Sequence, residues 1–418
     1  MRFIADLHIH SRFSMATSRN LTLPVLAGWA MRKGINVLGT GDFTHPGWRK
    51  ELAATLAPDD ASGLLRLKIP AAPPSPAPAM EPLFCLQTEI SCIYKRNGRV
   101  RKIHNLIFMP DFAAADKFSA KLASLGNIAS DGRPILGLDS RDLFELALDC
   151  SPRAALVPAH IWTPWFGVLG SKSGFDALQD CYGDLTSHIV ALETGLSSDP
   201  PMNRLVSALD NFAMISNSDA HSGANLGREA NLFSGQPSYD GIFAALAEAS
   251  RRKPDPDGAC QFLGTLEFYP EEGKYHLDGH RACNLALAPD EARALNNICP
   301  VCAKPLTVGV LHRVTDLADR QNQPALHNEP PTRMLIPLPE VVGQIMRLKP
   351  GAKSVEQKCA AIVSELGPEL DVLCLMPLEQ ISTFWEPLGL AIERVRDKNL
   401  RIAPGYDGVY GKIDIFGD

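Results

Sequence analysis

The first ten residues of the chain carry side chains that could bind metal. Apolar residues alternate with Asp6, His8 and His10, and in a β-strand this spacing places all three polar side chains on one face. Two histidines beside a carboxylate are ligands that catalytic divalent metals prefer. The stretch could instead hold one core histidine and one surface histidine. Further ligands elsewhere in the chain must decide between these interpretations.

Further candidate ligands lie at the ends of short apolar segments that we expect to be strands. Segments 35–38, 154–158, 188–192 and 212–216 each run into polar residues, as strands of α/β enzymes do at the edge where the chemistry takes place. Six of the eleven histidines belong to the candidate set, which is more than one ion can use, so we expect two or three divalent ions (Zn, Mn, Fe or Mg). The set comprises His8, His10, Asp42, His45, Glu89, His104, His160, Glu193, Asp219 and His221.

Residues 84–95 and 99–109 are expected to pair as a β-hairpin. The pair Asn97-Gly98 between them is the strongest short hairpin signal. If it forms the two-residue turn, Glu89 and His104 become diagonal neighbours on one face of the hairpin, about 7–8 Å apart by backbone position. Both side chains could then reach the same ion.

Overall composition is that of an ordinary globular protein, with 45% hydrophobic and 21% charged residues in a chain of 418. This length suits two or three domains. A formal net charge of −6 excludes a generally basic, DNA-coating protein, so nucleic-acid binding would need local cationic patches. We find neither an apolar signal region nor a stretch long enough to span a membrane, and expect a cytoplasmic protein without membrane contact.

Two stretches without a helix or strand pattern indicate how the chain is organised. The proline-rich stretch 69–82 is expected to be an exposed inserted loop, because its prolines lack donors and fix φ, and residues 253–258 are expected to form a linker. We therefore expect a catalytic region over 1–252, a zinc-binding module over 259–322 and a helical C-terminal region over 330–418 that ends in a glycine-rich loop.

The zinc-binding module is expected from two short motifs. His280-x2-Cys283 is followed, after fifteen residues, by Cys299-x2-Cys302, which is the spacing of a structural zinc site with one histidine ligand. His276 is an alternative fourth ligand. The remaining cysteines are mostly isolated in apolar sequence and are expected to be buried thiols.

The C-terminal region shows helical, amphipathic patterns over 338–348, 355–366 and, in pieces, 378–399. The closing loop Gly405–Lys412 could cradle a phosphate through its amides or be an ordinary tight turn.

Taken together, the motifs of residues 1–250 resemble the PHP (polymerase and histidinol phosphatase) superfamily. With the motifs that follow, nearly the whole chain resembles the endonuclease Q family of that superfamily. This implies an α/β fold, a distorted (β/α)7 PHP barrel with a trinuclear metal site, followed by a small zinc-binding module and a helical C-terminal region. The resemblance rests on His8-x-His10, the loop Gly39–His45, Glu89, His104, His160, Asp219-x-His221, the segment Tyr275–Cys283, the Cys299/Cys302 pair and the final Gly-Tyr-Asp-Gly loop.

By this resemblance the protein would be a metal-dependent DNA repair endonuclease. It would hydrolyse the phosphodiester 5′ to deaminated bases (uracil, hypoxanthine, xanthine) or abasic sites, with Glu89, His10 and Asp219 at the catalytic centre and Glu89 bridging two ions. Asp6 would orient a histidine. The second motif departs from the Thr-Asp-His of many members, which leaves open whether Asp42 or His45 binds metal.

Candidate substrate-binding residues fall into two sets. Trp162, Trp165 and Phe166 directly follow His160 and could form the wall of a base pocket or pack at the rim of the barrel. The cations expected to contact DNA phosphates, unless the hairpin tip is merely solvated, are Lys95, Arg96, Arg99, Arg101, Lys102 and Arg281.

Two other functions compete with the repair endonuclease. A small-molecule phosphatase of the histidinol-phosphate type would share the metal site but would not need the zinc module or the cationic hairpin. A non-enzymatic PHP module in a repair or replication complex would not need a near-complete ligand set. A sliding clamp or other repair proteins are partners that the sequence leaves open.

Overall fold

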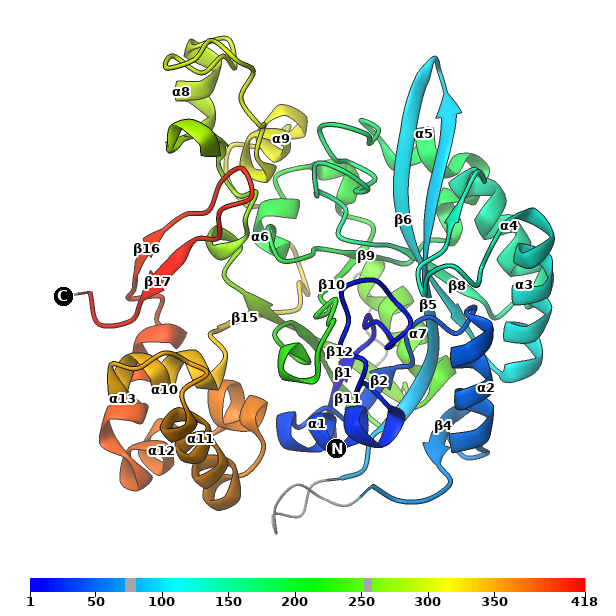
Figure 1. Cartoon of the computed structure of the whole chain (residues 1–418), viewed down its shortest axis with the longest axis horizontal. Helices are drawn as coiled ribbons and strands as arrows, with labels where there is room; N and C mark the ends of the chain where they lie inside the picture. Colours follow the sequence, from blue (N-terminus) through cyan, green and yellow to red (C-terminus); the bar gives the residue numbers. More distant parts are fainter. Residues whose placement is uncertain (72–79, 252–257, 418) are drawn as a thin grey trace.

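The computed structural model describes residues 1–71, 80–251 and 258–417. Most of the proline-rich stretch 69–82 and of the expected linker 253–258 therefore lies outside the described residues. Figure 1 shows a barrel with surrounding helices and two further regions beside it, one containing helix α8 and the other the helices near the C-terminus.

Seven strands follow one another around the barrel. Ladder pairs join the neighbours from β1 to β8 and from β9 to β10. Two backbone hydrogen bonds close the ring, because Ile161 N donates to Glu193 O at 3.0 Å and His10 N donates to Ala220 O at 3.0 Å. The strands are β1 (Arg2–Asp6), β2 (Val37–Gly39), β5 (Leu83–Arg96), β6 (Arg99–Met109), β8 (Ala155–Pro158), β9 (Ala191–Glu193) and β10 (Ala213–Ile215).

Other strands widen the sheet beyond this ring. Strand β11 (Ala230–Gly235) pairs with β1, β12 (Cys260–Phe268) with β11, and β15 (Thr332–Leu335) lies parallel to β12. The sheet thus continues past residue 252, and β12 lies in the range 259–322 that we expected to belong wholly to the zinc module. On the other side, the strands beyond β5 are β3 (Leu56–Asp59), β4 (Leu64–Leu67) and β7 (Ile135–Leu136).

Alternation along β1 divides its side chains between two buried cores. Phe3 and Ala5 belong to one apolar cluster and Ile4 to another, so the strand is covered on both faces. Helix α1 (Leu23–Lys33) follows Thr22 and ends at Gly34, whose φ of 87° makes a left-handed cap. The other barrel helices are α2 (Pro46–Thr55), α3 (Phe112–Leu125), α4 (Ser140–Cys150), α5 (Leu178–Tyr182), α6 (Pro200–Asn203) and α7 (Tyr239–Ser250).

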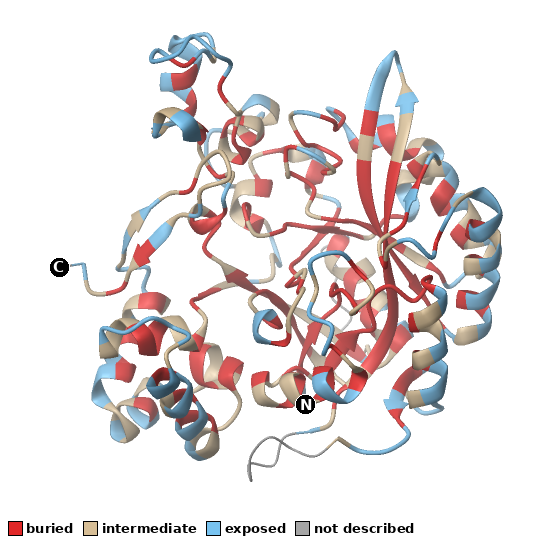
Figure 2. Cartoon of the chain, in the orientation of Figure 1, coloured by how far each residue is buried: buried red, intermediate tan, exposed pale blue. Residues whose placement is uncertain are grey.

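The β5–β6 hairpin has the register that its turn residues predict. Asn97 and Gly98 have φ values of 53° and 73°, which a type I′ turn requires, and Glu89 pairs with Leu106 while His104 pairs with Ser91. The base of the hairpin is buried and its tip is exposed (Figure 2). The hairpin therefore delivers Glu89 and His104 to the inside of the barrel.

The zinc-binding module lies between β12 and β15 in the sequence. It contains β13 (Asp278–His280), β14 (Leu285–Leu287), α8 (Pro289–Ala294) and α9 (Val310–Leu317). Short 3₁₀ turns in the chain are Gly183–His188, Ser207–Leu209, Gly223–Asn225, Pro270–Glu272 and Arg281–Cys283.

The C-terminal region is helical as expected and has an apolar core of its own. A buried ion pair joins it to the barrel, with Lys33 Nζ on α1 2.8 Å from Glu369 Oε1. Among the described residues, no helix has the length and apolarity to cross a membrane. The elements are α10 (Leu338–Met346), α11 (Lys353–Leu366), a π-turn (Asp371–Leu375), α12 (Leu378–Phe384), α13 (Glu386–Arg396), β16 (Arg401–Ala403) and β17 (Lys412–Asp414).

The glycine-rich loop between β16 and β17 is a structural turn. Gly405 N donates to Glu271 O, Gly408 N to Lys274 O and Gly411 N to Glu272 O. Since these amides are used by the backbone of residues 271–274, they do not form a phosphate cradle.

Candidate metal centre

Four side chains from three distant segments meet inside the mouth of the barrel. His8 and His10 follow β1, Glu89 lies on β5 and Asp219 follows β10, and one ligand atom of each lies within 4.8 Å of the others. His10 Nε2 is 3.1 Å from both Glu89 Oε2 and Asp219 Oδ1, and His8 Nε2 is 3.6 Å from the same two atoms. Two imidazoles and two carboxylates therefore converge on one point.

A second group shares Glu89 with the first. Glu89 Oε1 is 2.6 Å from His104 Nδ1 and 3.2 Å from His160 Nε2, and these three residues could hold another ion. Because Oε2 faces the first group and Oε1 faces the second, Glu89 is placed where a carboxylate could bridge two cations.

Carboxylates hold the two histidines of the first group from behind. Glu193 Oε1 lies 3.0 Å from His8 Nδ1, and Asp42 Oδ1 lies 3.0 Å from His10 Nδ1. Since a carboxylate accepts, each Nδ1 donates a proton to it, so Nε2 is the ring nitrogen that faces the group and could bind an ion on losing its own proton. Asp42 and Glu193 are thus placed to orient histidines, although we expected them among the ligands.

Unsatisfied buried atoms test whether this group fits a metal ion. His8 Nε2, His10 Nε2 and Asp219 Oδ1 are buried and have no hydrogen-bond partner among the described residues. Such atoms are costly unless something binds them. Imidazole nitrogens and carboxylate oxygens without thiolates suit a catalytic divalent ion, so the residues fit the expected metal.

Burial and neighbouring charges shift the pKa values of the candidate ligands. Burial lowers the pKa of His8, but the surrounding carboxylates outweigh burial and raise that pKa to about 10. At His104 burial prevails and lowers the pKa to about 4. Burial opposes ionisation of Glu89 and Asp219, yet the adjacent histidines, and Arg133 at Glu89, hold the pKa of both carboxyls well below its ordinary value. The carboxylates are therefore charged near neutral pH.

Three residues at strand ends adopt backbone conformations that are unusual for side chains with a Cβ. Asp42 after β2, His160 after β8 and Asp219 after β10 have φ values of 43°, 30° and 46°. Left-handed conformations of non-glycine residues are strained and cluster at functional sites. The strand ends thus turn sharply where they present these side chains.

Three other predicted residues do not join either group. His45 caps α2, with its Nε2 3.2 Å from Ala129 O and its ring against Phe13. The ring of His221 lies 4.5 Å from that of His10, but its Nδ1 is 2.9 Å from the backbone oxygen of Asp219. Asp6 accepts from backbone amides of the β10–β11 region and does not orient a histidine.

Arg133 is a site residue that the sequence did not reveal. Its Nη1 lies 3.0 Å from Glu89 Oε2, and 29% of its side chain is exposed. Gly132 lets this loop approach, since a Cβ there would lie 2.3 Å from Asp42 Oδ2 and from Ser14 Oγ. Arg133 lies in an irregular loop with no periodic or motif signal that could have identified it.

Among the predicted pocket residues, Trp162 is buried and its Nε1 donates to Asn203 Oδ1 at 2.7 Å. This corrects its assignment to a binding surface, because it packs in the barrel core. Trp165 is 41% exposed. Phe166 is half-buried, and its ring lies 4.3 Å from that of His104, at the edge of the second ligand group.

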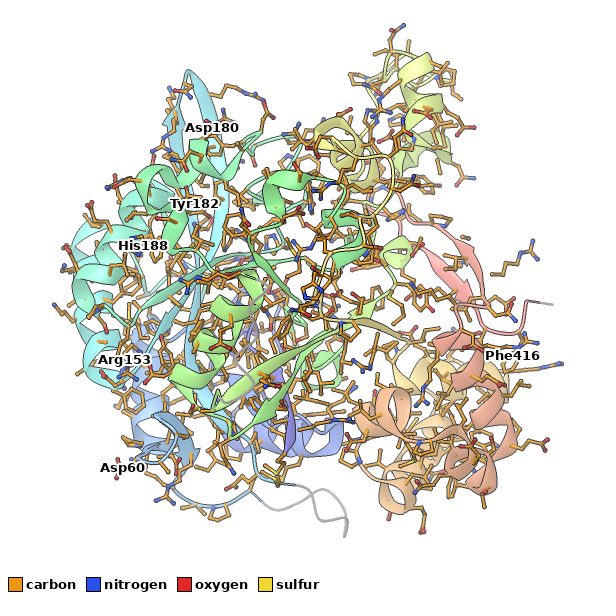
Figure 3. The ribbon with its side chains drawn as sticks, turned by 180° about the vertical axis from the view of Figure 1, so that it is seen from behind. Asp60, Arg153, Asp180, Tyr182, His188 and Phe416 are labelled. Atoms are coloured by element: carbon orange, nitrogen blue, oxygen red, sulfur yellow. The ribbon has the colours of Figure 1, made fainter. Side chains whose placement is uncertain are left out.

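The cations predicted to contact phosphate also fall into two groups. Arg101 is buried, lies over the Phe175 ring and donates to Gly174 O, and Arg96 bonds Asp139 and the backbone of residues 180–181. Seen from behind, Asp180 lies beside this hairpin (Figure 3). Arg101, and largely Arg96, therefore serve the fold. The cations that remain exposed or half-buried are Lys95, Arg99, Lys102 and Arg281.

A separate group of potential metal ligands lies in the zinc-binding module. His280, Cys283, Cys299 and Cys302 present ligand atoms within 4.8 Å of one another, and His276 is not part of this group. Burial raises the pKa of the Cys299 thiol, but the backbone amides of Val301 and Cys302 outweigh it and bring this pKa down to about 6. A thiolate with three neighbouring thiol or imidazole ligands fits zinc.

Comparisons with known proteins give a family model and two curated relatives. Residues 337–399 match the MJ0043 C-terminal domain. The chain is 29% identical over 256 residues to the uncharacterised protein MJ0043 of Methanocaldococcus jannaschii, covering 61% of this chain but only 31% of that relative. It is 29% identical over 325 residues to the uncharacterised protein YqxK of Bacillus subtilis, covering 74% of this chain and 73% of that protein.

Two solved structures match nearly the whole chain. The lesion-specific endonuclease PfuEndoQ of Pyrococcus furiosus superposes with a TM-score of 0.84 at 32% identity, covering 99% of this chain and 95% of that chain. An endonuclease Q bound to a 27-mer duplex substrate with an abasic lesion at its active site superposes with a TM-score of 0.83 at 32% identity, covering 99% and 96%.

Proposed function

This chain belongs to the endonuclease Q family, and from that premise we propose that it is a metal-dependent DNA repair endonuclease. It is a hydrolase acting on phosphate esters. We propose that it cuts the phosphodiester on the 5′ side of deaminated bases, namely uracil, hypoxanthine and xanthine, and of abasic sites.

The observation that carries this proposal is the position of Glu89. One carboxylate, buried and ionised, faces two groups of ligand atoms through its two oxygens. Paired metal ions suit displacement at phosphorus, because they can activate a water and stabilise the departing oxygen. A lone ion would not need this arrangement.

Each residue of the centre then has a separate task. His8, His10 and Asp219 would hold one ion, His104 and His160 would hold a second, and Glu89 would contact both. We propose two or three catalytic ions in total and one structural zinc. Because Glu193 and Asp42 fix the imidazole rings in advance, little reorganisation would accompany binding of metal or substrate.

Arg133 would act beside the scissile phosphate. It balances the charge of Glu89 and keeps part of its side chain exposed. A guanidinium can donate to carboxylate and phosphate oxygens together. We propose that Arg133 orients the phosphate while the exposed cations Lys95, Arg99, Lys102 and Arg281 contact the DNA backbone farther away.

The proposal is tested with purified protein, divalent metal and end-labelled duplexes that carry one uracil, hypoxanthine, xanthine or abasic site, or no lesion. We expect a nick 5′ to the lesion and an intact control strand. Metal analysis of the same preparation should give one tightly bound zinc and two or three further ions per chain.

Two outcomes would contradict the proposal. Release of phosphate from histidinol phosphate or another monoester, with intact DNA, would indicate a small-molecule phosphatase. Absence of both activities, with the full metal content, would indicate a non-enzymatic role. Recruitment by a sliding clamp or another repair protein stays a prediction for binding experiments.

A further inference from the structure

Two aromatic side chains stand out because they are exposed. Across residues 1–71, 80–251 and 258–417, Trp165, at 41%, and Tyr410, at 60%, are the large aromatic side chains that lie in the exposed class. Trp165 follows barrel strand β8, whereas Tyr410 lies in the loop between β16 and β17, far from it in the sequence. A single exposed aromatic ring needs no explanation, but aromatic rings that are linked into one surface can mark a binding site.

These two rings are parts of one continuous row. The ring centroids of Trp165 and Tyr275 are 5.9 Å apart in an edge arrangement. Lys274 Nζ lies 5.6 Å from the centroid of Tyr275 and 5.9 Å from that of Tyr410. We call Trp165, Tyr275, Lys274 and Tyr410 the aromatic row.

The aromatic row begins at the metal centre. Trp165 adjoins Phe166, whose ring lies 4.3 Å from that of His104, and His104 contacts Glu89. Phe166 has a φ of 69°, and its carbonyl oxygen accepts from His104 N at 2.9 Å. The backbone at the start of the row is therefore fixed to β6.

The far end of the row is also held in place. Gly408 N donates to Lys274 O at 2.8 Å, and Val310 N donates to Tyr275 O at 2.7 Å. Thus the β16–β17 loop and helix α9 fix the two residues between the exposed rings. The row is a preformed surface assembled from barrel, zinc module and C-terminal segment.

The positive charges along the aromatic row indicate which kind of molecule could bind there. Lys274 lies between two rings, Lys102 Nζ is 5.6 Å from the centroid of Phe166, and Arg281 Nη1 lies beside Gly408. Apolar rings alternating with cations suit stacked bases joined by phosphates. A protein partner would favour a contiguous apolar patch with the cations at its rim.

The geometry points to the aromatic row as a stacking surface for unpaired bases of the substrate DNA next to the cut phosphodiester. This inference rests on the proposed function and deepens it: the enzyme would favour duplexes that are locally open at the lesion, because stacking on the row repays the loss of base stacking. Lys274, Tyr275 and Tyr410 would thereby join the substrate-binding residues.

Binding is measured without cleavage, in the full-length Glu89→Gln protein with divalent metal. Fluorescence anisotropy gives the Kd for two duplexes with an abasic analogue, one paired at all other positions and one with three unpaired nucleotides around the lesion. A 2-aminopurine in the open segment reports stacking through quenching. The variants are Trp165→Ala, Tyr410→Ala and Tyr410→Phe, each added to Glu89→Gln.

We expect the parent protein to bind the open duplex more tightly than the paired one. Trp165→Ala and Tyr410→Ala should each weaken binding of the open duplex about tenfold, change the paired duplex little and reduce the 2-aminopurine quenching, while Tyr410→Phe should behave like the parent. The matched control is Trp385→Ala, which removes an indole that also lies below a lysine, Lys358, but in the helical region. It should leave both Kd values unchanged.

The inference is overturned if both alanine variants keep the parent Kd for the open duplex, or if they weaken the two duplexes equally. Either result, with normal nicking by the otherwise unchanged protein, leaves the proposed function standing. If that protein neither binds nor nicks either duplex, the proposed function and the inference fall together.

Discussion

The barrel centre and the zinc-binding module both gather metal ligands, but they do so by different means. In the barrel, ligands from residue 8 to residue 219 are brought together by strands and held by second carboxylates before any ion binds. In the module, four potential ligands come from two short motifs, and the only apolar cluster there that is separate from the barrel core, among the described residues, is built on Ala292, Cys299 and Leu306. The fold makes the first site, whereas the metal must help to make the second.

This difference has a thermodynamic meaning. A large core stabilises the barrel, so strained and unsatisfied groups can be tolerated there and used for chemistry. A very small core cannot offset the entropy of ordering its chain, and the free energy of zinc binding becomes free energy of folding. Removing a ligand should therefore abolish activity in the barrel and structure in the module.

The largest effect is expected from Glu89→Gln. Loss of the shared carboxylate charge should lower DNA cleavage by a factor of about 10³ or more, because both ligand groups lose a member. The circular dichroism spectrum should stay that of the parent, since strands rather than ions hold the barrel. Cleavage at more than a tenth of the parent rate would show that Glu89 is not shared between ions.

Cys302→Ser tests the other region. We expect the zinc content to fall by about one per chain and residues 280–303 to lose protection from hydrogen exchange, since the structural ion contributes on the order of 10 kcal/mol to such modules. The barrel amides should keep their protection. Cys150→Ser, at a half-buried thiol outside the ligand group, is the matched control and should change neither measurement.

Asp42→Asn should reduce cleavage less than Glu89→Gln does. It tests whether Asp42 orients His10 rather than binding the metal itself. Asp42 holds His10 and accepts from Ser11 and Ser14, so its loss should weaken metal binding about 10- to 100-fold. Titration with Mn²⁺ should restore cleavage at high metal concentration. Glu89→Gln should not be rescued in this way, and equal behaviour of the two variants would contradict the distinction.

The smallest effect concerns the pH dependence of stability and involves Glu267 on β12, which extends the barrel sheet. Glu267 is buried, with Oε2 2.6 Å from Ser216 Oγ, and burial raises its pKa to about 8. Glu267 thus keeps its proton to a higher pH in the folded state than in the unfolded state. The protein therefore loses stability as the pH rises from 4.5, the ordinary pKa of a glutamate, towards 8. Glu267→Gln should remove this loss.

Thermal melting measures that effect. The variant should match the parent near pH 4.5 and exceed it in stability at pH 8.5, with a difference that grows as the pH rises between these values. The zinc module should show the reverse trend, because its ligands release the ion as acid protonates the thiols. A variant advantage that did not grow with pH would contradict the sign given for Glu267.

Local chemistry explains what the sequence could predict. The Asn97-Gly98 turn sets the hairpin register and with it the facing of Glu89 and His104, because a type I′ turn permits a single alignment. Spacing alone likewise pointed to the four residues of the module whose potential ligand atoms lie together. Each strand-end segment was recognised because apolar runs followed by polar residues are a short-range pattern.

What could not be predicted depends on side-chain direction and loop geometry. Asp42 and Asp219 both follow strands and both have positive φ, yet one lies behind His10 and the other faces its Nε2. Trp162 and Trp165 are three residues apart, and a tight turn buries the first and exposes the second. Arg133 reaches Glu89 from a loop that has no regular pattern.

The place of the zinc module in the sheet has an evolutionary consequence. The module is a long crossover between β12 and β15, which lie side by side and parallel. A crossover can grow, shrink or be exchanged without altering the pairing of the strands it connects. The module could therefore change in length while the strands that carry the candidate catalytic ligands keep their pairing, and related chains should differ in length there first.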